Sequence, residues 1–151
     1  MDDFTIAIEI SPDSDGFIPM ECPLCGERFG LRAEDIEDDE VLEIRCPHCG
    51  IVSESFVTPE IIELAEARLA NLALGLIHDE MEKLERTTKG KAIEIKAGRK
   101  PHEEPEPILA AEVNSLQEVQ CDNCGRAAKV SAVLAFSVFV CPCCGVSNIH
   151  G

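Results

Sequence analysis

The chain has 151 residues, 45% of them hydrophobic, and a formal net charge of −16 from 13 basic and 29 acidic side chains. It contains six Phe and neither Trp nor Tyr, which argues against one large aromatic core. Small domains with thin cores are usually stabilised by disulfides or metals. A net negative charge of this size repels phosphate backbones and therefore argues against general nucleic-acid binding.

The amino-terminal sequence lacks the features of a secretory signal, because the first residues are acidic and no apolar run follows a basic segment. The longest apolar stretch, residues 130–140, is interrupted by two serines and is too short to cross a bilayer. We therefore expect a cytoplasmic protein without membrane association. Thiols stay reduced there, and clustered cysteines are more often metal ligands than disulfides.

In chain order, the amino-terminal segment, residues 1–16, alternates apolar and polar side chains over 4–10 and predicts a strand before a turn-rich stretch. The acidic run over 34–40 lacks the oxygen spacing and the glycine of a calcium-binding EF-hand loop. We interpret it as a solvated loop.

Residues 60–87 have the apolar period of an amphipathic helix, with Thr58 as its N-cap, Pro59 in its first turn and Gly90 beyond its end. The apolar stripe is wide for an isolated surface helix. We expect it to pack on a ribbon, on its twin in a homodimer, or on a partner protein. The stripe comprises Ile61, Ile62, Ala65, Leu69, Leu72, Ala73 and Leu76.

The stretch 89–100 carries five basic residues and one acidic one, and alternation over 92–96 predicts a short basic strand. Between 101 and 107 stand three prolines and three glutamates, a composition typical of an extended, solvated linker. The predicted organisation is an N-terminal segment (1–16), a first ribbon (17–58), the helix and basic strand (59–100), a linker (101–115) and a second ribbon (116–151). The linker predicts two modules that fold independently.

Eight of the nine cysteines form four C-x2-C pairs, each followed by glycine. Two thiolates three residues apart reach one ion only across a tight turn, and the glycine permits the positive φ of that turn. Intervals of 20 and 16 residues separate the inner cysteines of the first two and the last two pairs, and both suit a hairpin that brings two pairs to one metal. The expected ligands of two Zn²⁺ ions are Cys22, Cys25, Cys46 and Cys49, and Cys121, Cys124, Cys141 and Cys144.

Residues 17–58 and 116–151 each resemble zinc ribbons of the rubredoxin-like, transcription-factor-IIB type. This resemblance implies a small α+β fold of two four-cysteine β-hairpin sites separated by the helix and the linker. Zinc ribbons occur in transcription factors, polymerase subunits and adaptors, so the resemblance implies a metal and a local fold without fixing a function.

Three other readings concern the cysteines. Thioredoxin-like redox chemistry uses one C-x-x-C pair at a helix start. A rubredoxin-like electron carrier would hold iron in the same four thiolates. Cys143 is left over inside the last pair. It could replace Cys144 as a ligand, although Cys144 is the one followed by glycine, or it is a reactive free thiol or a passive small residue.

No catalytic constellation stands out, and the four histidines lie apart from one another at 48, 78, 102 and 150. Because a closed four-thiolate shell leaves zinc no open position for water or substrate, we expect a non-enzymatic zinc-binding protein. Its expected role is protein–protein interaction, as an adaptor, regulator or immunity-type inhibitor, with a partner of basic surface. The alternative is a nucleic-acid-binding or transcription-related protein that uses residues 89–100, and the third reading is the iron electron carrier.

Overall fold

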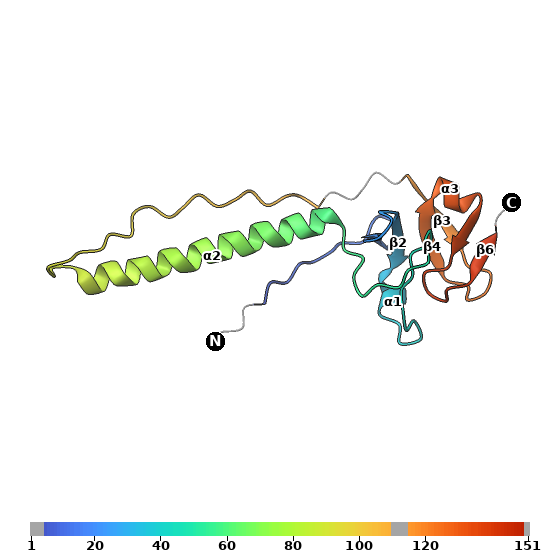
Figure 1. Cartoon of the computed structure of the whole chain (residues 1–151), viewed down its shortest axis with the longest axis horizontal. Helices are drawn as coiled ribbons and strands as arrows, with labels where there is room; N and C mark the ends of the chain where they lie inside the picture. Colours follow the sequence, from blue (N-terminus) through green and yellow to red (C-terminus); the bar gives the residue numbers. More distant parts are fainter. Residues whose placement is uncertain (1–4, 110–114, 150–151) are drawn as a thin grey trace. The chain divides into compact units, whose positions relative to one another are not determined.

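The computed structural model describes residues 5–109 and 115–149, and it is a small α+β structure (Figure 1). The chain divides into two compact units. We call Met1–Ile8 with Glu60–Leu109 the arm unit, and Glu9–Pro59 with Ala110–Gly151 the ribbon unit. Both cysteine clusters belong to the ribbon unit.

The centre of the ribbon unit is an antiparallel four-stranded sheet with the order β1-β2-β4-β3. β2 and β4 are its inner strands, and Gly30 pairs with Lys129 and Leu31 with Ala128. Each outer strand forms a hairpin with the inner strand that follows it in the chain. The strands are β1 (Phe17–Glu21), β2 (Arg28–Arg32), β3 (Leu116–Gln120) and β4 (Ala127–Ser131).

The β2–β4 pairing corrects the expectation of two ribbons that fold independently. One hairpin comes from residues 17–32 and the other from residues 116–131, yet they complete a single sheet. The apolar cluster around Phe29, Leu31 and Phe56 likewise includes Ala128 and is flanked by Val119 from the second ribbon. The two segments therefore share backbone hydrogen bonds and a core.

The two halves of the ribbon unit repeat one element order. A short helix follows each inner strand: α1 (Ala33–Ile36) follows β2, and α3 (Ala132–Ala135) follows β4. In the second half, β5 (Val138–Val140) then pairs with β6 (Ser147–Ile149). The matching segment of the first half, residues 41–45, forms no strand and contributes only a single bridge between Arg45 and Val52. The expected hairpin across each interval between two cysteine pairs is therefore wrong, because the hairpins β1–β2, β3–β4 and β5–β6 each enclose a single C-x2-C pair.

Two basic side chains of the second ribbon bind carboxylates of the N-terminal segment and of the first ribbon. Lys129 is buried, and its Nζ lies 2.6 Å from one carboxylate oxygen each of Asp13 and Asp15 and 5.0 Å from the centre of the Phe17 ring. Burial acts to lower the pKa of Lys129, but the hydrogen bonds to Asp13 and Asp15 outweigh it and leave this pKa raised. A buried ammonium group is tolerated only with such partners.

Arg126 makes the second set of contacts, to the acidic run over 34–40. Its guanidinium lies 3.4 Å from Asp35, 2.8 Å from Asp38 and 3.2 Å from Glu40. The interpretation of this run as a purely solvated loop is therefore wrong for these three carboxylates, because they serve as counter-ions to a residue of the other ribbon.

The arm unit is built on α2 (Pro59–Thr88) and on the chain that returns along it in an extended conformation (Figure 1). The Asn71 side chain donates to the carbonyl oxygen of Glu104 and accepts from its amide, and Arg68 pairs with Glu106 at 3.1 Å. The Pro/Glu segment over 101–107 is thus attached to the helix by specific polar contacts.

Two predicted strands of the arm unit and its vicinity are absent. Residues 92–96 form no strand, because the amides of Ile95 and Ala97 donate to the side chains of Thr88 and Glu85 and not to a neighbouring strand. In the amino-terminal prediction over 4–10, residues 5–10 also form no strand, and residue 4 lies outside the described residues.

The shared sheet predicts that the two ribbons lose structure together. Cys46→Ser removes a ligand of the first cluster and should also weaken hydrogen-exchange protection in β3 and β4, because β4 depends on β2 for its inner hydrogen bonds. Amide exchange measured by mass spectrometry on peptides from 17–32 and 116–131 would test this. Unchanged protection in the second peptide would show that the ribbons are independent after all.

Candidate metal centres

All four C-x2-C pairs adopt the same backbone turn. The amide of the first cysteine donates to the carbonyl five residues later, and the amide of the following glycine donates back to the first cysteine's carbonyl, at distances of 2.9–3.0 Å. The four glycines have φ between 73° and 76°, a conformation that costs little only without a Cβ. This local geometry is why each pair is followed by Gly26, Gly50, Gly125 or Gly145.

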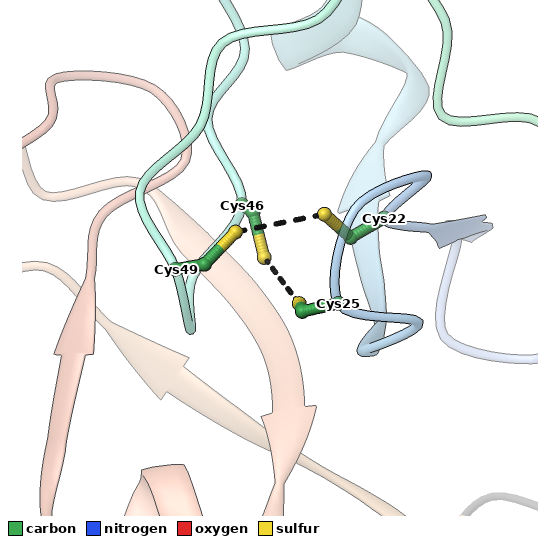
Figure 2. A group of neighbouring side chains, drawn as sticks. All are labelled: Cys22, Cys25, Cys46 and Cys49. Atoms are coloured by element: carbon green, nitrogen blue, oxygen red, sulfur yellow. Dashed lines mark hydrogen bonds between the residues drawn. The ribbon is translucent and has the colours of Figure 1, made fainter.

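In the first cluster, the four sulfurs of Cys22, Cys25, Cys46 and Cys49 point toward one another (Figure 2). The Sγ atoms of Cys22 and Cys49 are 3.7 Å apart, and those of Cys25 and Cys46 are 3.6 Å apart. Cys22 and Cys46 are buried, whereas Cys25 and Cys49 are exposed. The first cysteine of each pair thus faces the core and the second lies at the rim.

The second cluster repeats this arrangement with Cys121, Cys124, Cys141 and Cys144. The sulfurs of Cys121 and Cys144 are 3.6 Å apart, as are those of Cys124 and Cys141. The first cysteine of each pair is again buried, but the second ones are half-buried instead of exposed.

These sulfur–sulfur distances test whether a metal ion fits. Four sulfurs at about 2.3 Å from a tetrahedral ion are about 3.8 Å apart, and within each cluster all ligand atoms lie within 4.8 Å of one another. A disulfide would require about 2.05 Å, and all nine cysteines are free. Both groups therefore fit zinc-ribbon-like metal sites in which four thiolates complete the shell.

The environment of the thiols differs from ligand to ligand. Burial acts to raise the pKa of Cys22, but hydrogen bonds from the amides of Cys25 and Leu24 outweigh it and lower this pKa to about 7. Similar amide hydrogen bonds, with one from Asn148, lower the pKa of Cys121 to about 6 against the effect of burial. Burial and the neighbouring thiols raise the pKa of Cys124 to about 12. Because metal ligation needs thiolates, binding to such a cluster releases protons.

The turn that carries Cys46 and Cys49 is hydrogen-bonded to the turn that carries Cys141 and Cys144. The Arg45 amide donates to the carbonyl oxygen of Pro142 at 3.0 Å, and the Val140 amide donates to that of Pro47 at 2.9 Å. Each donor directly precedes the first cysteine of its pair and each acceptor directly follows it. This reciprocal pair of bonds extends the contact between the ribbons from the sheet to the metal centres.

All eight cysteines predicted as ligands lie in these two clusters. Cys143 does not: it is half-buried and packs against the apolar cluster of the first ribbon. None of the four pairs precedes a helix start in the described part of the chain, so the thioredoxin-like arrangement is not present there. His48 is an exposed turn residue.

The sequence analysis missed the polar side chains that contact the second cluster. Asn148 is buried, and its Nδ2 donates to Cys121 Sγ at 3.5 Å. Asn123 donates to Cys144 Sγ at 3.6 Å. An asparagine inside a C-x-x-C pair or shortly after one is a usable signal, because its amide can donate to a thiolate that the turn places beside it.

Comparison of the chain with protein-family models, with curated proteins and with solved structures finds no match. Of the helices in residues 5–109 and 115–149, none is both long enough and apolar enough to cross a membrane.

Proposed function

We propose that the chain is a zinc protein in which two four-thiolate sites stabilise a domain that binds another protein. The observation that carries the metal part is the convergence of eight thiols into two closed groups of tetrahedral dimensions. Soft thiolate ligands favour zinc among the abundant divalent ions, although iron adopts the same geometry.

A non-enzymatic role follows from the chemistry of such sites. Four cysteine ligands leave no coordination position for water or substrate, so the ion would stiffen the fold without acting as a Lewis acid. A polar cavity of about 480 Å³ lies between the ribbons and is lined by Arg32, Asp35, Glu118 and Arg126 among others. Its basic groups already pair with carboxylates, including Arg32 with Glu118 at 3.4 Å. Neither the four-thiolate sites nor this cavity therefore suggests a catalytic role.

The charge of the chain indicates the chemistry of the partner. A net charge of −16 favours a basic surface by electrostatic complementarity. A polymerase subunit, a nuclease or another nucleic-acid-binding protein has such a surface. The role we propose is that of an adaptor, regulator or inhibitor of a partner of this kind.

The contact surface that we propose is the apolar stripe of α2. Leu69 is 57% exposed and Leu76 40% exposed, and they stand seven residues apart on the same helical face. Ile62 lies seven residues before Leu69 and is 49% exposed. A row of half-exposed aliphatic side chains at this spacing suits a partner helix, from another protein or from a second copy of this chain.

The first prediction is the metal content. The purified protein should contain two zinc ions per chain and be colourless, because each cluster supplies one complete tetrathiolate shell. Elemental analysis with a protein concentration from amino-acid analysis measures this. A red protein with iron–thiolate absorption would support the electron-carrier reading instead, and one ion per chain would contradict the two-site proposal.

The second prediction concerns the stripe. Leu69→Asp combined with Leu76→Asp should abolish association through α2, seen as self-association in sedimentation or as capture of the partner from the native source. Stability should change by only about 0.5 kcal/mol, since both side chains are already largely exposed. The matched control is Leu42→Asp with Ile108→Asp, the same chemical change at exposed positions outside the stripe. If the stripe variant associates like the control, α2 is not the contact surface.

The third prediction separates this role from nucleic-acid binding. Lys89, Lys91, Lys96 and Arg99 are exposed, but Lys100 pairs with Glu103 at 2.9 Å. In the ribbon unit, Arg126 and Lys129 are bound to carboxylates. We expect no appreciable DNA or RNA binding at physiological salt, because few free cations face a strongly acidic chain.

Titration of labelled single- and double-stranded oligonucleotides at low and physiological salt measures this binding. The control variant replaces the five basic residues of 89–100 with serine. Submicromolar binding that persists at physiological salt and disappears in the control would make nucleic-acid recognition the better proposal.

A further inference from the structure

The two metal centres have the same backbone but different side chains around their sulfurs. Three positions differ in a way that bears on thiolate chemistry: the residue before the second cysteine of the first pair, the residue two places after that cysteine, and the residue four places after the last cysteine. The second centre has Asn123, Arg126 and Asn148 at these positions, and the first has Leu24, Glu27 and Ser53.

Asn148 is the most constrained of these residues. Its buried amide group donates to Cys121 Sγ at 3.5 Å and to the carbonyl oxygen of Val146 at 2.9 Å, and its Oδ1 accepts the Asp122 amide at 2.9 Å. The hydrogen bonds to Cys121 and from Asp122 connect one C-x2-C turn of the centre to the other, and the bond to Val146 holds the side chain locally. Its N–H group is therefore fixed against the sulfur.

Asn123 adds to this effect. Its Nδ2 donates to Cys144 Sγ at 3.6 Å. Two thiolates of the second centre, Cys121 and Cys144, thus accept a hydrogen bond from a side-chain N–H group, in addition to the backbone amides that both centres share.

The first centre lacks such donors. In the part of the chain that the structure describes, no side-chain N–H donates to its sulfurs; Leu24 is exposed, and the Ser53 hydroxyl donates to the carbonyl oxygen of Ser55 instead. Cys25 and Cys49 are themselves exposed, whereas Cys124 and Cys144 are half-buried. The thiolates of Cys25 and Cys49 are therefore accessible, and no side-chain hydrogen bond in the described part of the chain withdraws negative charge from them.

We propose that the two centres are not equivalent: the first is a reactive thiolate centre that gives up its metal to electrophiles and competing chelators, and the second is an inert structural centre. Hydrogen bonds to a thiolate withdraw electron density from sulfur and stabilise it as a ligand, and burial restricts the approach of a reagent. The class of reactant that the first centre would take is a small soft electrophile. This inference rests on the proposed zinc sites.

The chemistry at the first centre is an addition with a defined balance. With N-ethylmaleimide as the probe, the sulfur of Cys25 or Cys49 uses its electron pair to form a bond to one carbon of the maleimide double bond. The other carbon takes a proton from water, no electrons are gained or lost overall, and the metal loses one ligand. A centre reduced to three thiolates then releases its ion to a chelator.

The test uses the full-length zinc-loaded protein with Cys143→Ser, which removes the unligated thiol. Zinc release to the chromogenic chelator 4-(2-pyridylazo)resorcinol should occur in two phases of equal amplitude, with rates that differ by about tenfold or more, the size of effect seen when partners of metal ligands are removed. Limited maleimide labelling followed by peptide mass spectrometry should find Cys25 and Cys49 modified before any ligand of the second centre.

Exchange variants assign the effect to the named residues. Asn123→Leu and Asn148→Ser, singly, give the second centre the side chains of the first and should accelerate the slow phase only. Leu24→Asn is the matched variant at the first centre and should leave the slow phase unchanged. Because Asn148 is buried and its variant can fail to fold, Asn123→Leu, at an exposed position, decides in that case.

The outcomes separate this inference from the proposed function. A chain that binds fewer than two zinc ions contradicts the proposed function. A chain that binds two ions but releases them at one rate, or whose second-centre cysteines are labelled first, contradicts the inference of unequal centres alone. A slow phase that both asparagine variants leave unchanged also overturns it.

Discussion

Four thiolates that must meet at the corners of one tetrahedron constrain this chain more than any other interaction. The constraint acts first on the backbone, since each C-x2-C pair has to turn tightly enough to aim two sulfurs at one point, and the glycines at positive φ make that turn possible. It then acts on the topology, because each hairpin encloses only one pair and two pairs far apart in the sequence must still meet at one point. The apolar clusters are small, so metal ions held by the two cysteine groups would add stability that the core alone supplies only in part.

The second constraint is the pairing of β2 with β4, which makes one domain of two ribbons. The sheet, the reciprocal amide–carbonyl bonds between Arg45 and Pro142 and between Val140 and Pro47, and the ion pairs of Lys129 and Arg126 all cross the same boundary. These contacts come from different parts of the fold, and each of them stabilises the association of the two ribbons. Loss of either metal centre should therefore be felt in the whole ribbon unit.

Local chemistry explains what the sequence analysis predicted well. The eight cysteines that come together and the glycine turns follow from spacing and residue type alone. The apolar period over 60–87 indicated a helix, and α2 covers Pro59–Thr88. In each case the information lies within a few residues of the feature.

The failures concern contacts between distant residues. Residues 92–96 alternate like a strand but form none, and the Ile95 amide donates to the Thr88 hydroxyl instead. Lys129 reads as an ordinary surface lysine until the fold places Asp13 and Asp15 beside it. The proline-rich segment suggested separate modules, because its composition indicates an extended linker. Composition gives no information on strand pairing, so the β2–β4 pairing could not be predicted from it.

Two exposed features bear on the proposed role: the apolar face of α2 and the rim cysteines of the first centre. The first suits a helical partner, and the second suits a site that responds to reactive compounds. The two surfaces belong to different units, because α2 lies in the arm unit and both cysteine clusters lie in the ribbon unit.

The central claim is that all bound metal sits in tetrahedral four-sulfur shells, and X-ray absorption at the metal K-edge tests it most directly. We predict a zinc edge and a single shell of four sulfur scatterers at about 2.3 Å, with no contribution from lighter ligands. A fit that requires nitrogen or oxygen scatterers at about 2.0–2.1 Å for part of the zinc would contradict it, because at least one cluster would then be open or incomplete.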